Sequence, residues 1–108
     1  MGEAQGDRVK LEFAQRALDE IERGKREWLA RRDKNPGLFE SELAEALANI
    51  KTVPGLGSPT DIVSRGQLVR RVEMRKTKYQ VYYRQHSDEL VYIVSVWGGQ
   101  RGSKPKLR

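Results

Sequence analysis

The sequence contains no cysteine, which excludes disulfide bonds, thiolate zinc sites and thiol nucleophiles. Its longest apolar run, residues 91–96, is interrupted by Ser95 and is far too short to span a bilayer. The first seven residues carry Glu3 and Asp7 and no apolar stretch, so they do not have the pattern of a signal peptide. We therefore expect a cytoplasmic protein with no metal, no cofactor and no membrane partner.

What is present fits one small domain. The chain has 108 residues, of which 37% are hydrophobic and 33% charged, a polar composition that still allows a core. We expect a single domain over residues 1–108, with its core in about residues 8–97 and a basic mobile tail in residues 98–108. The tail carries four bases and no acid, namely Arg101, Lys104, Lys106 and Arg108.

The net charge of +6 is distributed unevenly. Residues 1–50 carry 9 basic and 11 acidic side chains, whereas residues 51–108 carry 12 basic and 4 acidic ones. A basic half joined to a nearly neutral half suggests that one face meets something anionic, either nucleic acid, a machine bound to nucleic acid, or an acidic protein. The alternative is that the excess charge serves solubility only.

Hydrophobic periodicity predicts a strand followed by two helices. Alternation over residues 9–13 is typical of a half-buried strand, and apolar residues then recur at helical spacing over residues 14–29. Asn35-Pro36 suits a second helix start, with Asn as the cap, and that helix ends before the Pro-Gly turn at residues 53–57. So short a link predicts an antiparallel helical hairpin.

The rest of the chain has β character. Residues 67–74, 79–84 and 90–97 are rich in Val, Ile and Tyr, and short hairpin connections separate them. The last run is apolar on both faces, with Val96 placed beside Val94 by alternation, which predicts a central strand. The predicted fold is α+β, in the order β-α-α-β-β-β, with the helical hairpin packed on one face of a mostly antiparallel four-stranded sheet.

This order and several local stretches resemble the RelE/ParE superfamily of toxins from type II toxin–antitoxin systems. The resemblance covers roughly residues 8–107, and the stretches that carry it are Phe13–Ala17, Phe39–Leu43, Pro54–Gly57, Leu68–Arg75, Tyr79–Arg84 and Ile93–Gly102. It implies one of two activities: RelE-like members cut messenger RNA on the ribosome, whereas ParE-like members poison DNA gyrase. It also implies an antitoxin partner with an acidic or amphipathic tail, which covers the helical hairpin and a sheet edge.

Candidate catalytic residues lie on the second predicted strand. Arg71, Glu73 and Arg75 alternate, so all three are expected on one sheet face, and Arg75 stands where the resemblance places a functional arginine of the nucleases. Lys51 and Arg101 could add positive charge. A solvated strand face is the alternative interpretation of these residues.

The nuclease set is nevertheless incomplete. RelE-like nucleases usually carry a further arginine and a Tyr or His just after the last strand, but here residues 98–100 are Gly-Gly-Gln and the tail has neither type. The one histidine, His86, falls in a predicted surface turn. RNA cleavage needs both a base and an acid, and no acid is apparent.

The sequence therefore favours a ParE-like toxin that acts on DNA gyrase. A ribosome-dependent endonuclease acting on messenger RNA and a non-toxic basic binding module remain as alternatives. The residues expected to bind the target are Arg71, Arg75, Arg101, Lys104, Lys106 and Arg108. Those expected to bind the antitoxin are Trp28, Leu29, Phe39 and Leu43.

Overall fold

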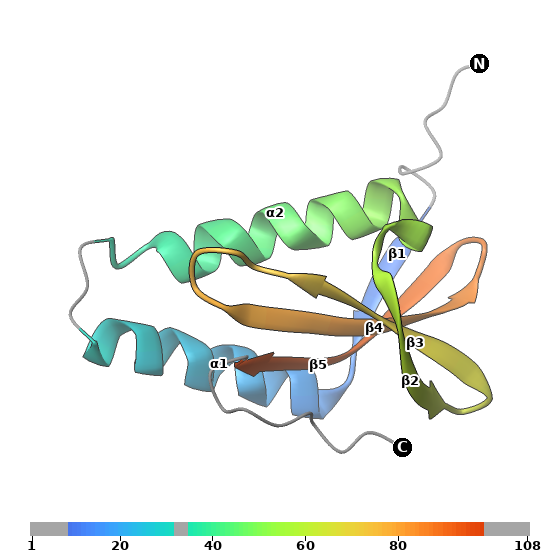
Figure 1. Ribbon diagram of the computed structural model, residues 1–108, viewed down its shortest axis with the longest axis horizontal. Helices are drawn as coiled ribbons and strands as arrows, with labels where there is room; N and C mark the ends of the chain where they lie inside the picture. Colours follow the sequence, from blue (N-terminus) through green and yellow to red (C-terminus); the bar gives the residue numbers. More distant parts are fainter. Residues whose placement is uncertain (1–8, 32–34, 99–108) are drawn as a thin grey trace.

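The structure, a computed structural model, describes residues 9–31 and 35–98. These residues form two α-helices, one short 3₁₀ helix (η2) and five strands (Figure 1). The elements follow in the order β1 (Lys10–Phe13), α1 (Gln15–Ala30), α2 (Leu38–Thr52), η2 (Pro54–Leu56), β2 (Ser58–Ser64), β3 (Gln67–Glu73), β4 (Tyr79–Ser87) and β5 (Leu90–Gly98). The predicted α+β class and the helical hairpin are confirmed. Neither helix is long and apolar enough to cross a membrane within the described residues.

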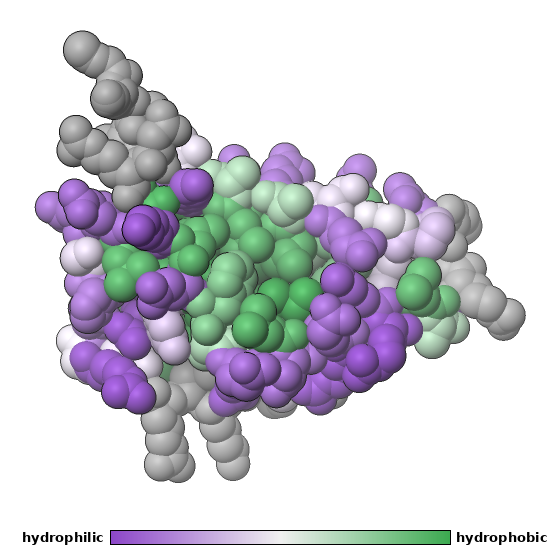
Figure 2. Space-filling view, turned by 180° about the vertical axis from the view of Figure 1, so that it is seen from behind, coloured by the Kyte–Doolittle hydropathy of each residue, from purple (hydrophilic) through white to green (hydrophobic). Residues whose placement is uncertain are grey.

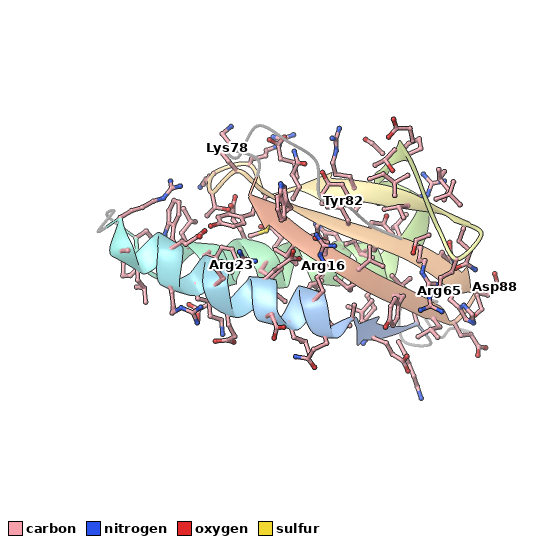
Figure 3. All side chains as sticks on the ribbon, turned by 90° about the horizontal axis from the view of Figure 1, so that it is seen from below. Arg16, Arg23, Arg65, Lys78, Tyr82 and Asp88 are labelled. Carbon is pink, nitrogen blue, oxygen red and sulfur yellow. The ribbon has the colours of Figure 1, made fainter. Side chains whose placement is uncertain are left out.

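The five strands form one sheet in the order β1-β5-β4-β3-β2. Strand β1 runs parallel to β5, and the other three pairings are antiparallel. The two helices lie on one face of this sheet and leave the other face open (Figures 1 and 3). Strand β5 lies between β1 and β4, as its apolar character on both faces predicts.

The sheet has one strand more than the four predicted, because β2 was not expected. Its first half, Ser58-Pro59-Thr60-Asp61, has no apolar alternation and contains a proline, which an edge strand tolerates. The two-residue turn to β3 is formed by Arg65 and Gly66, with φ of 52° and 79°. A turn of this kind requires φ above zero at both positions, and arginine there is an unusual choice, so the sequence signal for the hairpin was weak.

The main core lies between the helices and the sheet. Phe39 of α2 packs edge-on against Tyr79 of β4, with ring centroids 4.9 Å apart. A Cβ atom at Gly24 of α1 would lie 2.7 Å from the Phe39 ring. Glycine lowers the stability of a helix relative to alanine, but at position 24 it is needed for the close approach of α1 to Phe39.

The start of α2 differs from the prediction. The helix begins at Leu38, and its N-terminal cap is Gly37, with no side-chain hydrogen bond. Asn35 instead uses its carbonyl oxygen, which accepts hydrogen bonds from the Leu38 amide (3.1 Å) and from Nε1 of Trp28 (2.9 Å). Asn35 thus closes a turn and holds the end of α1, and Gly37 takes the cap position of α2 instead.

A bulge in β5 changes which side chains face the helices. Tyr82 pairs with Ser95 but Tyr83 pairs with Ile93, so Val94 is an extra residue in β5. As a result Val96 joins the main core, whereas Trp97 packs beside Val94 on the open face. Strict alternation had placed Val96 beside Val94, which is wrong because of this bulge.

Glu20 of α1 holds the bulged segment in place. Its Oε1 accepts hydrogen bonds from Oγ of Ser95 (2.7 Å) and from the Val96 amide (2.9 Å), and Oε2 accepts one from Nε of Arg16 (3.0 Å). Glu20 is buried, so these bonds replace the water that a carboxylate requires. This carboxylate fixes α1 to the C-terminal half of β5.

Candidate functional site

The open face of the sheet carries a small cluster of apolar side chains with Arg71 beside it. Val69, Tyr82 and Val94 are buried there, and Ile62, Tyr92 and Trp97 pack against them. Arg71 of β3 lies directly opposite Tyr82 of β4, and both line a hollow of about 220 Å³ that they share with Pro59, Thr60 and Asp61. Arg71 is therefore placed on this face as predicted, beside an aspartate that the sequence did not point to, because Asp61 lies on the unpredicted strand.

The three candidate residues of the second predicted strand do not form one row. Glu73 is the last residue of β3 and is exposed, whereas Arg75 lies beyond the strand, in the turn between β3 and β4. The chain leaves the regular pleat at Met74, whose side chain is buried in the main core. The expectation that Arg71, Glu73 and Arg75 share a sheet face is therefore wrong for Arg75.

This turn carries a cluster of basic side chains. Arg75, Lys76 and Lys78 are all exposed there. Gly98, the last described residue of β5, pairs with Tyr79 immediately after the turn. The predicted target-binding residues Arg101, Lys104, Lys106 and Arg108 follow Gly98 in the chain but lie outside the described residues.

Glu42 of α2 fixes the conformation of the basic turn. Its carboxylate accepts hydrogen bonds from the amides of Lys76 and Thr77 (both 2.9 Å) and from Oγ1 of Thr77 (2.9 Å). Burial alone would raise the pKa of Glu42, but these hydrogen bonds and the charge of Lys76 together hold that pKa below its ordinary value. The turn is thus a fixed support for its exposed bases.

The remaining candidate groups for catalysis lie elsewhere. Lys51 is exposed in the last turn of α2, nine residues after Glu42, which corresponds to about 14 Å along the helix. His86 is exposed near the end of β4, close to the turn that leads into β5, and it is a strand residue and not the turn residue that we expected. The described residues therefore do not gather Lys51, His86 and Arg75 around one point.

The residues expected to bind the antitoxin are mostly core residues. Trp28, Phe39 and Leu43 are buried, and only Leu29 is exposed, at 56%. Their role in antitoxin binding stays a prediction. The periodicity that singled them out marks the side of each helix that faces the sheet, so it selects residues that are already covered.

The structure exposes other apolar residues between the helices. Lys25 of α1 lies 3.9 Å from Glu40 of α2, so the faces that carry these two residues meet. Leu18 lies seven residues before Lys25 and Leu47 seven residues after Glu40, which places both on the facing sides of the antiparallel pair. Leu18 is 42% exposed and Leu47 is partly buried. Figure 2, seen from the helix side, shows hydrophobic side chains gathered in the middle of this face.

The geometry of the molecule shows two candidate surfaces for contact with other macromolecules. One is the apolar area between the helices, which we call the helix-side patch and define by Leu18 and Leu47. The other is the open sheet face with the basic turn at its end. Exposed apolar patches of this kind usually mark protein interaction sites.

Comparisons with known proteins point to one family. Residues 11–102 match the sequence model of the family described as ParE toxin of type II toxin–antitoxin system, parDE. A solved structure described as the chromosomal ParDE TA system from P. aeruginosa is similar, with a TM-score of 0.63 over 84% of this chain and 96% of that chain. Its sequence identity is 12%, so this likeness concerns the fold alone. A comparison with curated proteins gives no match.

Proposed function

Because the chain belongs to the ParE toxin family of type II toxin–antitoxin systems, we propose that it arrests bacterial growth by binding and poisoning DNA gyrase, and that a cognate antitoxin neutralises it. In this proposal the toxin acts by occupying its target and performs no chemistry of its own. The observation that carries the proposal is that Glu73 and Arg75 line one hollow beside α2, whereas Arg71 and His86 each line a different one.

RNA cleavage needs a base and an acid close to the same phosphate. Tyr82 is the group next to Arg71 that could carry a proton, but it is 2% exposed and its hydroxyl donates to Oε1 of Gln80 at 3.0 Å. Lys51 lies in the last turn of α2, and His86 lies near the C-terminal end of β4. This arrangement favours a binding surface over a nuclease site.

The helix-side patch supports the antitoxin part of the proposal. Leu18 and Leu47 flank an apolar area that neither helix covers, and an amphipathic helix can place its apolar face on such an area. Binding there leaves the open sheet face uncovered.

The basic turn supports the target part of the proposal. Its three exposed bases lie at the end of the sheet from which the chain continues into the four bases of residues 101–108. Basic clusters increase the rate of association with an acidic or nucleic-acid-bound partner, and added salt weakens this effect. Gyrase in the act of passing DNA is a partner of that kind.

The proposed function is tested with purified components. The full chain is expected to inhibit supercoiling by gyrase and to increase the amount of DNA trapped in cleaved form. The same preparation is expected to leave messenger RNA intact on translating ribosomes. Toxin-dependent cuts in the ribosomal A site, with gyrase unaffected, would instead identify a ribosome-dependent endonuclease. No effect in either assay, from folded protein that also fails to arrest growth, would identify a non-toxic binding module.

A second prediction concerns the target surface. Changing Arg71 and Arg75 together to alanine is expected to lower toxicity sharply, because Arg75 is exposed and Arg71 is partly exposed near the proposed contact. The melting temperature should change little, since each surface substitution costs less than about 0.5 kcal/mol. Affinity for the antitoxin should be unchanged. Deleting residues 101–108 should have the same effect on toxicity.

The matched control removes two exposed bases elsewhere, with Lys10 and Arg26 changed to alanine. This control has the same net charge as the Arg71 and Arg75 variant and should remain toxic. Growth arrest is measured from viable counts at equal expression. Full toxicity of the folded Arg71 and Arg75 variant, or equal loss in the control, would show that this face is not the target surface.

A further inference from the structure

A second hollow lies on the open sheet face, at the end opposite the basic turn. It has a volume of about 460 Å³, and its lining comes from four strands and the β2–β3 turn: Glu12, Arg65, Gln67, Arg84, His86, Leu90 and Tyr92. Figure 3 shows Arg65 and Asp88 together at this end of the sheet and Lys78 at the other. The hollow lies on the same face as Arg71 but at the end away from the basic turn, and it shares no lining residue with the hollow beside Arg71.

The chemically unusual residue of this hollow is Arg84. It is 7% exposed, and its Nη1 donates to Oε1 of Gln67 at 2.6 Å. The guanidinium carbon lies 4.7 Å from the centre of the Tyr92 ring, in the cross-strand pair that Arg84 forms with Tyr92. Its Nε is buried and has no hydrogen-bond partner among the described residues. No ion pair joins Arg84 to Glu12 or to another described carboxylate.

Burying the Nε–H of this arginine without an acceptor costs stability. A buried charge normally has a carboxylate partner, and a buried donor without an acceptor retains its full desolvation cost. The unpartnered edge of the guanidinium, Nε–H with Nη2–H, is also the edge that matches the two oxygens of a carboxylate. We propose that this hollow is a binding site for the carboxylate of an Asp or Glu side chain on a partner protein, held by the guanidinium of Arg84.

The charges around the hollow favour a single carboxylate over a phosphate. The lining contains two arginines, Arg65 and Arg84, and one carboxylate, Glu12. Its net charge is therefore +1 when His86 is neutral. The adjoining β4–β5 turn carries Asp88 and Glu89, and both are exposed. A nucleic acid would bring several phosphates close to these carboxylates, whereas one acidic side chain can enter the hollow alone.

The shape favours a side chain presented by a protein over a free small acid. The hollow opens to solvent on the sheet face, so a small molecule would bury little of its surface there, whereas ligand pockets normally bury most of the ligand. Leu90 and Tyr92 offer apolar contacts for the aliphatic stem of Asp or Glu. A partner protein supplies the remaining affinity through the surface around the hollow.

Binding also requires a small rearrangement. Nε of Arg84 is covered, and Gln67, which holds Nη1, also donates from Nε2 to the carbonyl oxygen of His86 at 3.3 Å. This long hydrogen bond is the weakest contact at the rim. We expect Gln67 to move when a carboxylate arrives, so that its side-chain amide reports binding together with Arg84.

The experiment is a nitrogen-15 NMR titration of the full chain with N-acetyl-glutamate N-methylamide, whose only charge is a side-chain carboxylate. The expected result is saturable shifts of the Arg84 Nε–H and the Gln67 side-chain amide, in the millimolar range typical of so small a probe. The corresponding glutamine compound, at the same ionic strength, should cause none. Glu12→Gln should tighten binding several-fold, because it removes the competing carboxylate of the lining.

Two variants separate a binding role from a structural one. Arg84→Met should abolish the shifts at Gln67 and raise the melting temperature, because an apolar side chain of similar length replaces a buried unpaired charge. Arg84→Lys keeps the charge without the paired donors, and should bind at least tenfold more weakly. Each of the following results would overturn the proposal. The glutamine compound causes equal shifts, or inorganic phosphate causes larger ones. Alternatively, Arg84→Lys binds as well as the original protein, or both variants unfold.

Discussion

Changing Leu18 and Leu47 together to aspartate is expected to produce a toxin that its antitoxin no longer neutralises. Both residues flank the helix-side patch, and neither is fully buried, so the fold should survive. An aspartate in an apolar interface must be desolvated without a partner, and central interface residues commonly contribute about 2 kcal/mol or more each. Antitoxin affinity should therefore fall by at least about a hundred-fold.

The measurement combines calorimetric titration with antitoxin and growth during co-expression of both proteins. A matched control exists at the tip of the β2–β3 hairpin, where Val63 and Leu68 form a cross-strand pair and are 61% and 43% exposed. Their replacement by aspartate adds the same charges to a more exposed apolar pair outside the patch, and neutralisation should persist. Normal neutralisation of the Leu18 and Leu47 variant would show that the antitoxin binds elsewhere.

Glu20→Ala is expected to have the largest effect on stability. The change leaves the Ser95 hydroxyl and the Val96 amide buried without their acceptor, and each such group costs about 1–3 kcal/mol. A total of about 3 kcal/mol would lower the melting temperature of a domain of this size by at least about 12 °C. The loss should be visible in thermal unfolding followed by circular dichroism.

The control for this variant is Glu22→Ala, two residues further along α1. Glu22 is exposed and bonds only to Lys25 among the described residues, at 3.3 Å, so its loss should cost less than about 0.5 kcal/mol. A Glu20→Ala variant that melts within about 3 °C of the original protein would mean that the bulged segment of β5 does not depend on this carboxylate.

The main architecture could be predicted because each element has a clear period. The alternation in residues 9–13, the helical stripes ending near Leu29 and Ile50, and the apolar faces of β5 all act locally and agree with the fold. Strand β2 could not be predicted in the same way. It lies at the edge of the sheet, where one side is solvated. Pro59 and its neighbours therefore need no apolar alternation, and the sequence signal for a strand is missing.

The candidate site was predictable only in part. Arg71 lies on the open face as alternation predicts, but alternation fails for Arg75, where the turn begins, and after Val94, where the bulge begins. Periodicity also cannot distinguish a residue covered by its own sheet from one left for a partner. For this reason Phe39 was selected and Leu18 was not, although the structure buries Phe39 and exposes Leu18.

The most direct test of the central claim is made in growing cells that express the full chain without antitoxin. DNA and RNA are taken from the same culture as growth stops, gyrase-linked DNA breaks are quantified after detergent treatment, and the ends of messenger RNA are mapped. We predict gyrase-linked breaks that rise with toxin expression and disappear when antitoxin is supplied, with no new ends within codons. New messenger RNA ends within codons, without gyrase-linked breaks, would contradict the claim that the toxin acts on gyrase.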